Sequence, residues 1–89
     1  MKNLTIYSTK RSFMIKDVVL MGRDYGSKEV IIINKNNNMI AINFDDYKIA
    51  HSFIEYVNNQ HFCWGKENIN IDEAAFDLDL EINTISVKA

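Results

Sequence analysis

Proline is absent from this 89-residue chain, and there is only one cysteine, Cys63. A single cysteine excludes an intramolecular disulfide and fits a protein of the reducing cytoplasm. No apolar run approaches the ~18 residues of a transmembrane helix, and Met1–Lys10 lacks the apolar stretch of a signal peptide. We therefore expect a cytoplasmic protein that depends on a hydrophobic core, with no membrane as partner.

Basic residues are absent from one long stretch, residues 67–81. Residues 1–35 contain seven bases and three acids, whereas nine acids face three bases from residue 36 onward, behind a formal net charge of −2. The acids of the base-free stretch are Glu67, Asp72, Glu73, Asp77, Asp79 and Glu81. A concentrated negative field attracts basic partners, and it argues against direct binding of nucleic acid.

The length and composition indicate a single globular domain over residues 1–89. A chain of this size buries only about 60–65% of the surface that its unfolded form exposes, so the core is small. Hydrophobic residues make up 47% of the sequence, which is usual for a globular fold and argues against disorder.

Four segments in the first half have the composition of strands. Val30–Ile33 is a continuous β-branched run, typical of a strand that is buried on both faces. Gly22–Ser27 predicts a loop, and Asn36–Asn38 predicts a hairpin turn, because glycine and asparagine accept positive φ. The predicted strands are residues 3–9, 12–21, 29–35 and 39–44.

The clearest helix is predicted at residues 46–59, with Asp45 as its N-cap. Its apolar residues recur at the three- and four-residue spacing that lines one helical face. We expect this face to pack on the sheet. The expected core residues are Ala50, Phe53, Ile54, Val57, Ile31, Ile33, Ile40, Ile42 and Trp64.

A second, acidic helix is predicted at residues 71–79, because Asn70 and Glu73 have the spacing of a capping box. A strand at residues 82–88 follows. Residues 76–82 also alternate between apolar and acidic side chains, so a strand there remains the alternative. Together, these segments predict an α+β fold with one antiparallel sheet of about four strands, one packed helix, a short acidic helix and a C-terminal strand.

Catalytic and metal-binding patterns are weak. Cys63 and His61 lie two residues apart, but a nucleophile and its base need an orienting third group. Cys63 stands between Phe62 and Trp64 and is interpreted as a small apolar filler. His51, His61 and Cys63 lack a recognised ligand spacing for a metal. We therefore predict no enzyme activity, no metal and no cofactor.

The order of elements after residue 29 resembles that of small phage-encoded type II anti-CRISPR proteins. Five features carry the resemblance. They are the apolar run before the Asn-rich hairpin, the helix that follows it, the Trp-Gly pair, the acidic segment and the final strand. The residues concerned are Val30, Ile31, Ile32, Ile49, Phe53, Ile54, Trp64, Gly65, Asp72, Glu73, Phe76 and Thr84–Lys88. The N-terminal third departs from the pattern, because residues 3–9 predict a strand where a helix is expected.

The resemblance implies a non-enzymatic inhibitor that binds the RNA-guided nuclease of a host CRISPR system in the host cytoplasm. An acidic face would occupy the basic channel of the nuclease and exclude DNA, as carboxylates at regular spacing stand in for phosphates. Another defence protein with a basic groove would suit the same residues. The expected partner-binding residues are Asp72, Glu73, Asp77, Glu67 and Asp79, extended by Asp45 and Asp46.

Two other functions fit parts of the sequence. A homo-oligomeric binder of a small nucleotide-like ligand would use Arg23, Tyr25, His61 and Trp64 to stack on a base and to hold a phosphate. A structural accessory subunit would oligomerise through the edge of its sheet.

Overall fold

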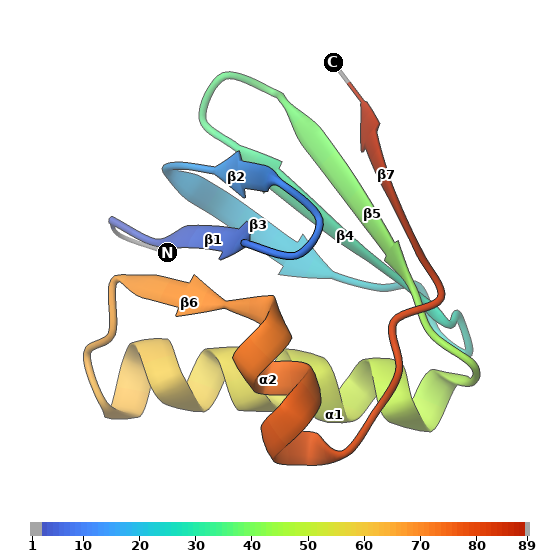
Figure 1. Ribbon diagram of the computed structural model, residues 1–89. Coiled ribbons are helices and arrows are strands. Elements are labelled where there is room, and N and C mark those ends of the chain that lie inside the picture. The colour runs from blue at the N-terminus through green and yellow to red at the C-terminus, as the bar shows by residue number, and fades with distance from the viewer. Residues whose placement is uncertain (1–2, 89) are drawn as a thin grey trace.

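The computed structural model describes residues 3–88, which form an α+β fold (Figure 1). Seven strands lie on one side, and the two helices lie together on the other. The strands are β1 (Thr5–Ser8), β2 (Phe13–Ile15), β3 (Val18–Gly22), β4 (Glu29–Asn34), β5 (Met39–Asn43), β6 (Asn68–Asn70) and β7 (Thr84–Lys88). The helical elements are α1 (Tyr47–Asn58), a π-helical continuation η1 (Asn59–Cys63), and α2 (Ile71–Leu78). The predicted fold class and the C-terminal strand are confirmed.

The strands form two sheets instead of the single predicted sheet. One has the order β2-β1-β6 and the other the order β3-β4-β5-β7. The predicted strand 12–21 is divided between them, because Asp17 has a φ of 56° and turns the chain between β2 and β3. Side-chain composition alone does not reveal this break. The smaller sheet is completed by β6, which runs parallel to β1 although more than sixty residues separate the paired positions.

The larger sheet buries mainly one of its faces. Val30 and Ile32 of β4 point into the core, whereas Ile31 and Ile33 lie half-buried on the opposite face. The expectation that β4 is buried on both faces, with Ile31 and Ile33 in the core, is therefore wrong. Successive side chains in a strand point to opposite faces, and the helices and the smaller sheet cover only one of them. On β5, Ile40 and Ile42 are buried as expected.

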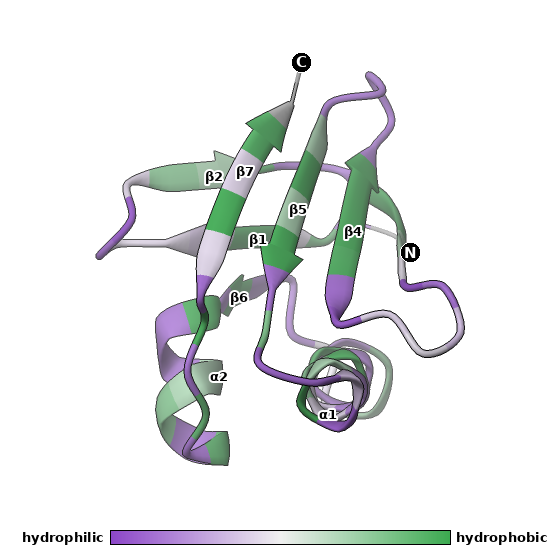
Figure 2. Ribbon diagram, turned by 90° about the vertical axis from the view of Figure 1, so that its right-hand side faces the viewer, coloured by the Kyte–Doolittle hydropathy of each residue, from purple (hydrophilic) through white to green (hydrophobic). Residues whose placement is uncertain are grey.

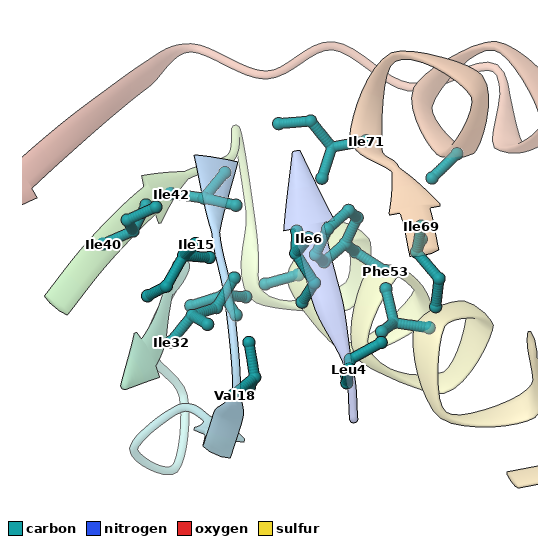
Figure 3. Close-up of a cluster of buried hydrophobic side chains, with 14 of the residues drawn as sticks. Leu4, Ile6, Ile15, Val18, Ile32, Ile40, Ile42, Phe53, Ile69 and Ile71 are labelled. Atoms are coloured by element: carbon teal, nitrogen blue, oxygen red, sulfur yellow. The ribbon is translucent and has the colours of Figure 1, made fainter. Parts of the chain in front are cut away.

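The core fills the space between the two sheets and the helices (Figure 3). Ala50, Phe53 and Val57 of α1 are buried, as the helical periodicity predicts. The rings of Phe44 and Phe53 lie 5.2 Å apart, centroid to centroid. The prediction that Trp64 belongs to the core is wrong, because Trp64 is 76% exposed. Trp64 follows the end of the helical segment, where the chain has already left the face that packs on the sheets.

A capping side chain marks the start of α1, but it lies one residue later than the sequence predicts. Asp46, and not Asp45, caps α1, since its side chain accepts hydrogen bonds from the N–H groups of Lys48 (2.8 Å) and Ile49 (3.0 Å). The predicted end at residue 59 is also too early, because η1 continues the helical path to Cys63. Gly65, with a φ of +69°, follows.

The second helix matches its prediction closely. Asn70 caps α2 by accepting a hydrogen bond from the N–H of Asp72 at 2.8 Å. Because α2 covers Ile71–Leu78 and β7 begins at Thr84, the strand alternative for residues 76–82 is wrong. The hairpin at Asn36–Asn38 is confirmed, and Asn34 Oδ1 holds it by accepting from the N–H groups of Asn36 and Asn38.

Candidate interaction surface

The segment that contains both helices also contains most of the acidic residues. In the view of Figure 2, α1 is seen nearly end-on beneath the strands, with α2 beside it. The helix-bearing segment, residues 45–82, contains nine acids and two lysines, a formal charge of −7. Residues 3–44, which form the first five strands, contain six bases and three acids, a formal charge of +3. We call the side formed by α1 and α2 the acidic helical layer.

Glu73 and Asp77 form a pair of exposed carboxylates on α2. They stand four residues apart, so their Cβ atoms lie about 5–6 Å from each other on one face of the helix. The buried positions of α2, Ile71 and Ala74, point towards the core. This phase leaves Glu73 and Asp77 directed away from the core.

Asp77 is held in place by the neighbouring helix. The hydroxyl of Tyr56, on α1, donates a hydrogen bond to Asp77 Oδ2 at 2.7 Å. Burial, this hydrogen bond and the charges of Asp77 and Glu73 together raise the pKa of Tyr56 to about 12. At neutral pH the phenol is protonated and able to donate this hydrogen bond to Asp77.

Asp72 has a structural role that its sequence pattern does not show. Its carboxylate accepts hydrogen bonds from the Ser8 hydroxyl (2.8 Å), the Thr9 N–H (3.0 Å) and the Lys10 N–H (3.1 Å). Burial alone would raise the pKa of Asp72, but the hydrogen bonds from Lys10, Ser8 and Thr9 outweigh it and lower the pKa. Asp72 thus fastens the turn between β1 and β2 to the start of α2.

The other four predicted acids also contribute to local structure. Asp46 caps α1, and Asp45 accepts a hydrogen bond from the Asn83 side chain at 2.8 Å. Asp79 ends α2 with a φ of 52°, in the left-handed region. Glu67 is exposed, and its backbone carbonyl accepts from the N–H of Thr5 at 2.7 Å.

The residues of the alternative ligand site lie far apart. The guanidinium of Arg23 lies 5.9 Å from the ring centroid of Tyr47, at the start of α1. His61 stands in η1, fourteen residues further along the helical path, which corresponds to about 20 Å. Arg23 with Tyr25 and His61 with Trp64 therefore occupy opposite ends of the helix and do not share a pocket.

The Cys63 segment offers no assembled catalytic group within residues 3–88. Cys63 is exposed, so its interpretation as an apolar filler is wrong. Its thiol contacts the side-chain oxygen of Asn59 at 3.8 Å, and Nδ1 of His61 contacts the carbonyl oxygen of Lys66 at 2.7 Å. In this same described range no group of three or more His, Cys, Asp or Glu residues is placed to hold a metal ion.

Phe76 is a surface residue that the sequence reasoning did not assign to an interface. Its side chain is 85% exposed on α2, beside a shallow cavity of about 500 Å³ that Lys10, Arg11 and Leu80 also line. The helical phase set by Ile71 and Ala74 is the signal that places Phe76 outward. Aromatic residues are enriched at protein interfaces relative to the rest of the surface.

Comparison of the chain with protein-family models, with curated proteins and with solved structures found no match. None of the helices described within residues 3–88 has the length and apolar character needed to cross a membrane.

Proposed function

We propose that this protein is a small non-enzymatic inhibitor that binds a basic nucleic-acid groove of a partner protein through its acidic helical layer. The partner is a host defence protein, and the resemblance noted above favours a CRISPR-associated RNA-guided nuclease. The observation that carries the proposal is the charge of −7 on the helix-bearing segment against +3 on the first five strands. Such a layer competes with the phosphate backbone for the same cationic groups.

The geometry of α2 supports this role. Glu73 and Asp77 are exposed one helical turn apart, and Tyr56 holds Asp77 in a fixed position. A rigid carboxylate binds a cation at less entropic cost than a mobile one. Phe76 lies between them in sequence and supplies apolar contact area.

The test measures competition with DNA. A purified type II RNA-guided nuclease, loaded with guide RNA, is mixed with fluorescent target duplex and increasing amounts of this protein. We expect displacement of the duplex at low salt and weaker displacement at moderate salt, because exposed charges are screened. Capture from a bacterial lysate under the same two salt conditions extends the test to other basic partners.

The informative variant is Glu73→Lys, and the matched control is Asp24→Lys, which changes the net charge equally in an exposed loop between β3 and β4. Asp72 is unsuitable for charge reversal, because it fastens the β1–β2 turn. We expect Glu73→Lys to weaken partner binding roughly tenfold, about 1.4 kcal/mol, and Asp24→Lys to leave it unchanged. Equal effects of the two variants, or binding that DNA does not compete with, would refute the proposal.

A further inference from the structure

The last strand, β7, lies at one edge of the larger sheet. It pairs with β5 in an unbroken register from Asn43↔Thr84 to Met39↔Lys88. The opposite side of β7 has no neighbouring strand within residues 3–88. An edge strand presents backbone N–H and C=O groups that are able to pair with a further strand.

The other edges described in the two sheets are less suitable for pairing. β3 carries a register shift between Val18 and Leu20, and such irregularities disrupt pairing at an edge. β2 and β6, at the edges of the smaller sheet, have only three residues each. By contrast, β7 has five residues and a single charge, at its last residue Lys88, and the chain has no proline.

The core-facing side of β7 is incompletely covered. Val87 is paired with the buried Ile40, yet its side chain is 68% exposed. Across from it, Met14 of β2 is 57% exposed. Val87, Met14, Ile15 and Ile40 form the apolar part of a cavity of about 470 Å³, whose other lining residues are Lys16 and the β4–β5 hairpin residues Asn34, Asn36 and Asn38. Apolar side chains of an additional strand would cover the exposed part of Val87 and Met14.

The β1–β2 hairpin lies next to the free edge of β7. The guanidinium of Arg11, in its turn, donates a hydrogen bond to the carbonyl oxygen of Ile82 at 2.9 Å, just before β7. Figure 2 shows the hairpin extending beyond β7 on the side of the free edge. A second copy of this chain, paired through its own β7, would bring its own hairpin into the same space. The site therefore suits a single extended segment better than a second copy.

The charge of the hairpin indicates the composition of that segment. Residues 9–16 contain Lys10, Arg11 and Lys16 and no acid. Asp72 is the carboxylate that contacts this turn, and it is engaged by Ser8, Thr9 and Lys10. An incoming strand with acidic residues beside its apolar positions would complement the remaining positive charge.

We propose that the free edge of β7 binds an extended peptide segment of a partner protein, which adds a strand to the larger sheet. The segment has alternating apolar side chains that contact Met14 and Val87, and acidic residues that face the β1–β2 hairpin. Backbone hydrogen bonds supply affinity in this mode of recognition, and alternate side chains supply specificity. The proposal does not depend on the acidic helical layer and stands or falls separately from it.

The experiment selects peptides from a random library displayed on phage against the full chain. Enriched peptides are synthesised, titrated, and mapped by the NMR shifts and hydrogen exchange of the backbone amides. We expect enriched sequences to alternate apolar residues and to carry acids, and we expect the affected amides to lie in Thr84–Val87 and around Met14. Methylation of alternate peptide nitrogens removes the hydrogen-bond donors and should abolish binding.

The variant Val87→Glu places a charge of the same sign as that of the acidic segment on the uncovered apolar side of the edge, and Leu20→Glu is its matched control on β3, where Leu20 is 54% exposed. We expect Val87→Glu to weaken peptide binding at least about tenfold with an unchanged melting temperature, and Leu20→Glu to bind normally. The proposal is overturned by any of four results. These are a library without the expected pattern, shifts that map elsewhere, full binding of the methylated peptide, or a chain that dimerises through β7 by itself.

Discussion

Phe53 and Trp64 are large aromatic residues close in sequence, and they lie in opposite environments. Phe53 is fully buried against Phe44, whereas Trp64 is mostly exposed. Phe53 belongs to the face of α1 that packs on the strands, and Trp64 lies beyond the end of η1. At the scale of single residues, an aromatic side chain therefore stabilises the fold only where it lies on the helical face that packs on the strands.

Truncation of these two side chains should therefore give very different results. We expect Phe53→Ala to lower the free energy of unfolding by about 3–5 kcal/mol, because it leaves a cavity in the core. We expect Trp64→Ala to change it by less than about 0.5 kcal/mol, as for other exposed positions. Urea denaturation followed by circular dichroism measures both. A large loss of stability in Trp64→Ala would contradict its exposed position.

At the scale of elements, Asp72 links the first helical turn of α2 to the β1–β2 turn, more than sixty residues away in sequence. The link joins an element of the acidic helical layer to the hairpin of the smaller sheet. It also explains why a charged residue is partly buried at this position. The three hydrogen bonds to its carboxylate need the ionised form, and this dependence predicts an effect of pH.

We expect the stability contribution of Asp72 to disappear in acid. Its pKa in the folded protein lies below the ordinary value of 3.8. The contribution is therefore fully present above about pH 4 and is lost as the pH falls through the lower, folded-state pKa. Asp72→Asn should lower the free energy of unfolding by about 1–2 kcal/mol at neutral pH. This loss of stability relative to the wild type should shrink in acid. Denaturation at several pH values measures this.

The control for this prediction is Glu73→Gln, which removes the same charge from the neighbouring residue without removing those hydrogen bonds. We expect Glu73→Gln to have little effect on stability at neutral pH. The free energies of unfolding of the wild type and of Asp72→Asn are compared from neutral pH into acid. If their difference stays constant, the link does not depend on the ionised carboxylate.

At the scale of the whole molecule, one core connects all the layers. Ile6 and Ile15 come from the smaller sheet, Ile32 and Ile42 from the larger one, and Phe53 from α1, and all are part of the same buried cluster (Figure 3). Neither sheet has a separate core within the described residues. The two sheets should therefore gain and lose their structure together.

We expect thermal unfolding in a single cooperative transition. Because the sheets share one core, the enthalpy measured by calorimetry should equal the van't Hoff enthalpy. Amide hydrogen exchange of β1 and β4 should report similar opening free energies. Two separate transitions, or one sheet that exchanges freely while the other stays protected, would show that the sheets fold independently.

Sequence patterns located the elements whose structure depends on near neighbours. The helical spacing of Ala50, Phe53 and Val57 predicted α1, and the Asn70 cap predicted α2. The Asn36–Asn38 turn was likewise predicted, because local hydrogen bonds hold it. The charge asymmetry along the chain also persists in the structure, since the acidic half contains both helices.

Contacts between distant segments were decided only by the tertiary structure. Sequence reasoning missed the division between β2 and β3, the parallel pairing of β1 with β6, and the role of Asp72. The same holds for the spatial separation of Arg23 from His61, two residues of the alternative ligand site.

The sequence by itself determined the α+β class, the helices and the acidic character of the helix-bearing segment, because each follows from residues near one another in the chain. The tertiary structure alone decided which strand faces are covered, which acids are engaged and which strands lie at the sheet edges. These properties depend on packing between residues that are far apart in sequence, and local propensity carries no information about such contacts.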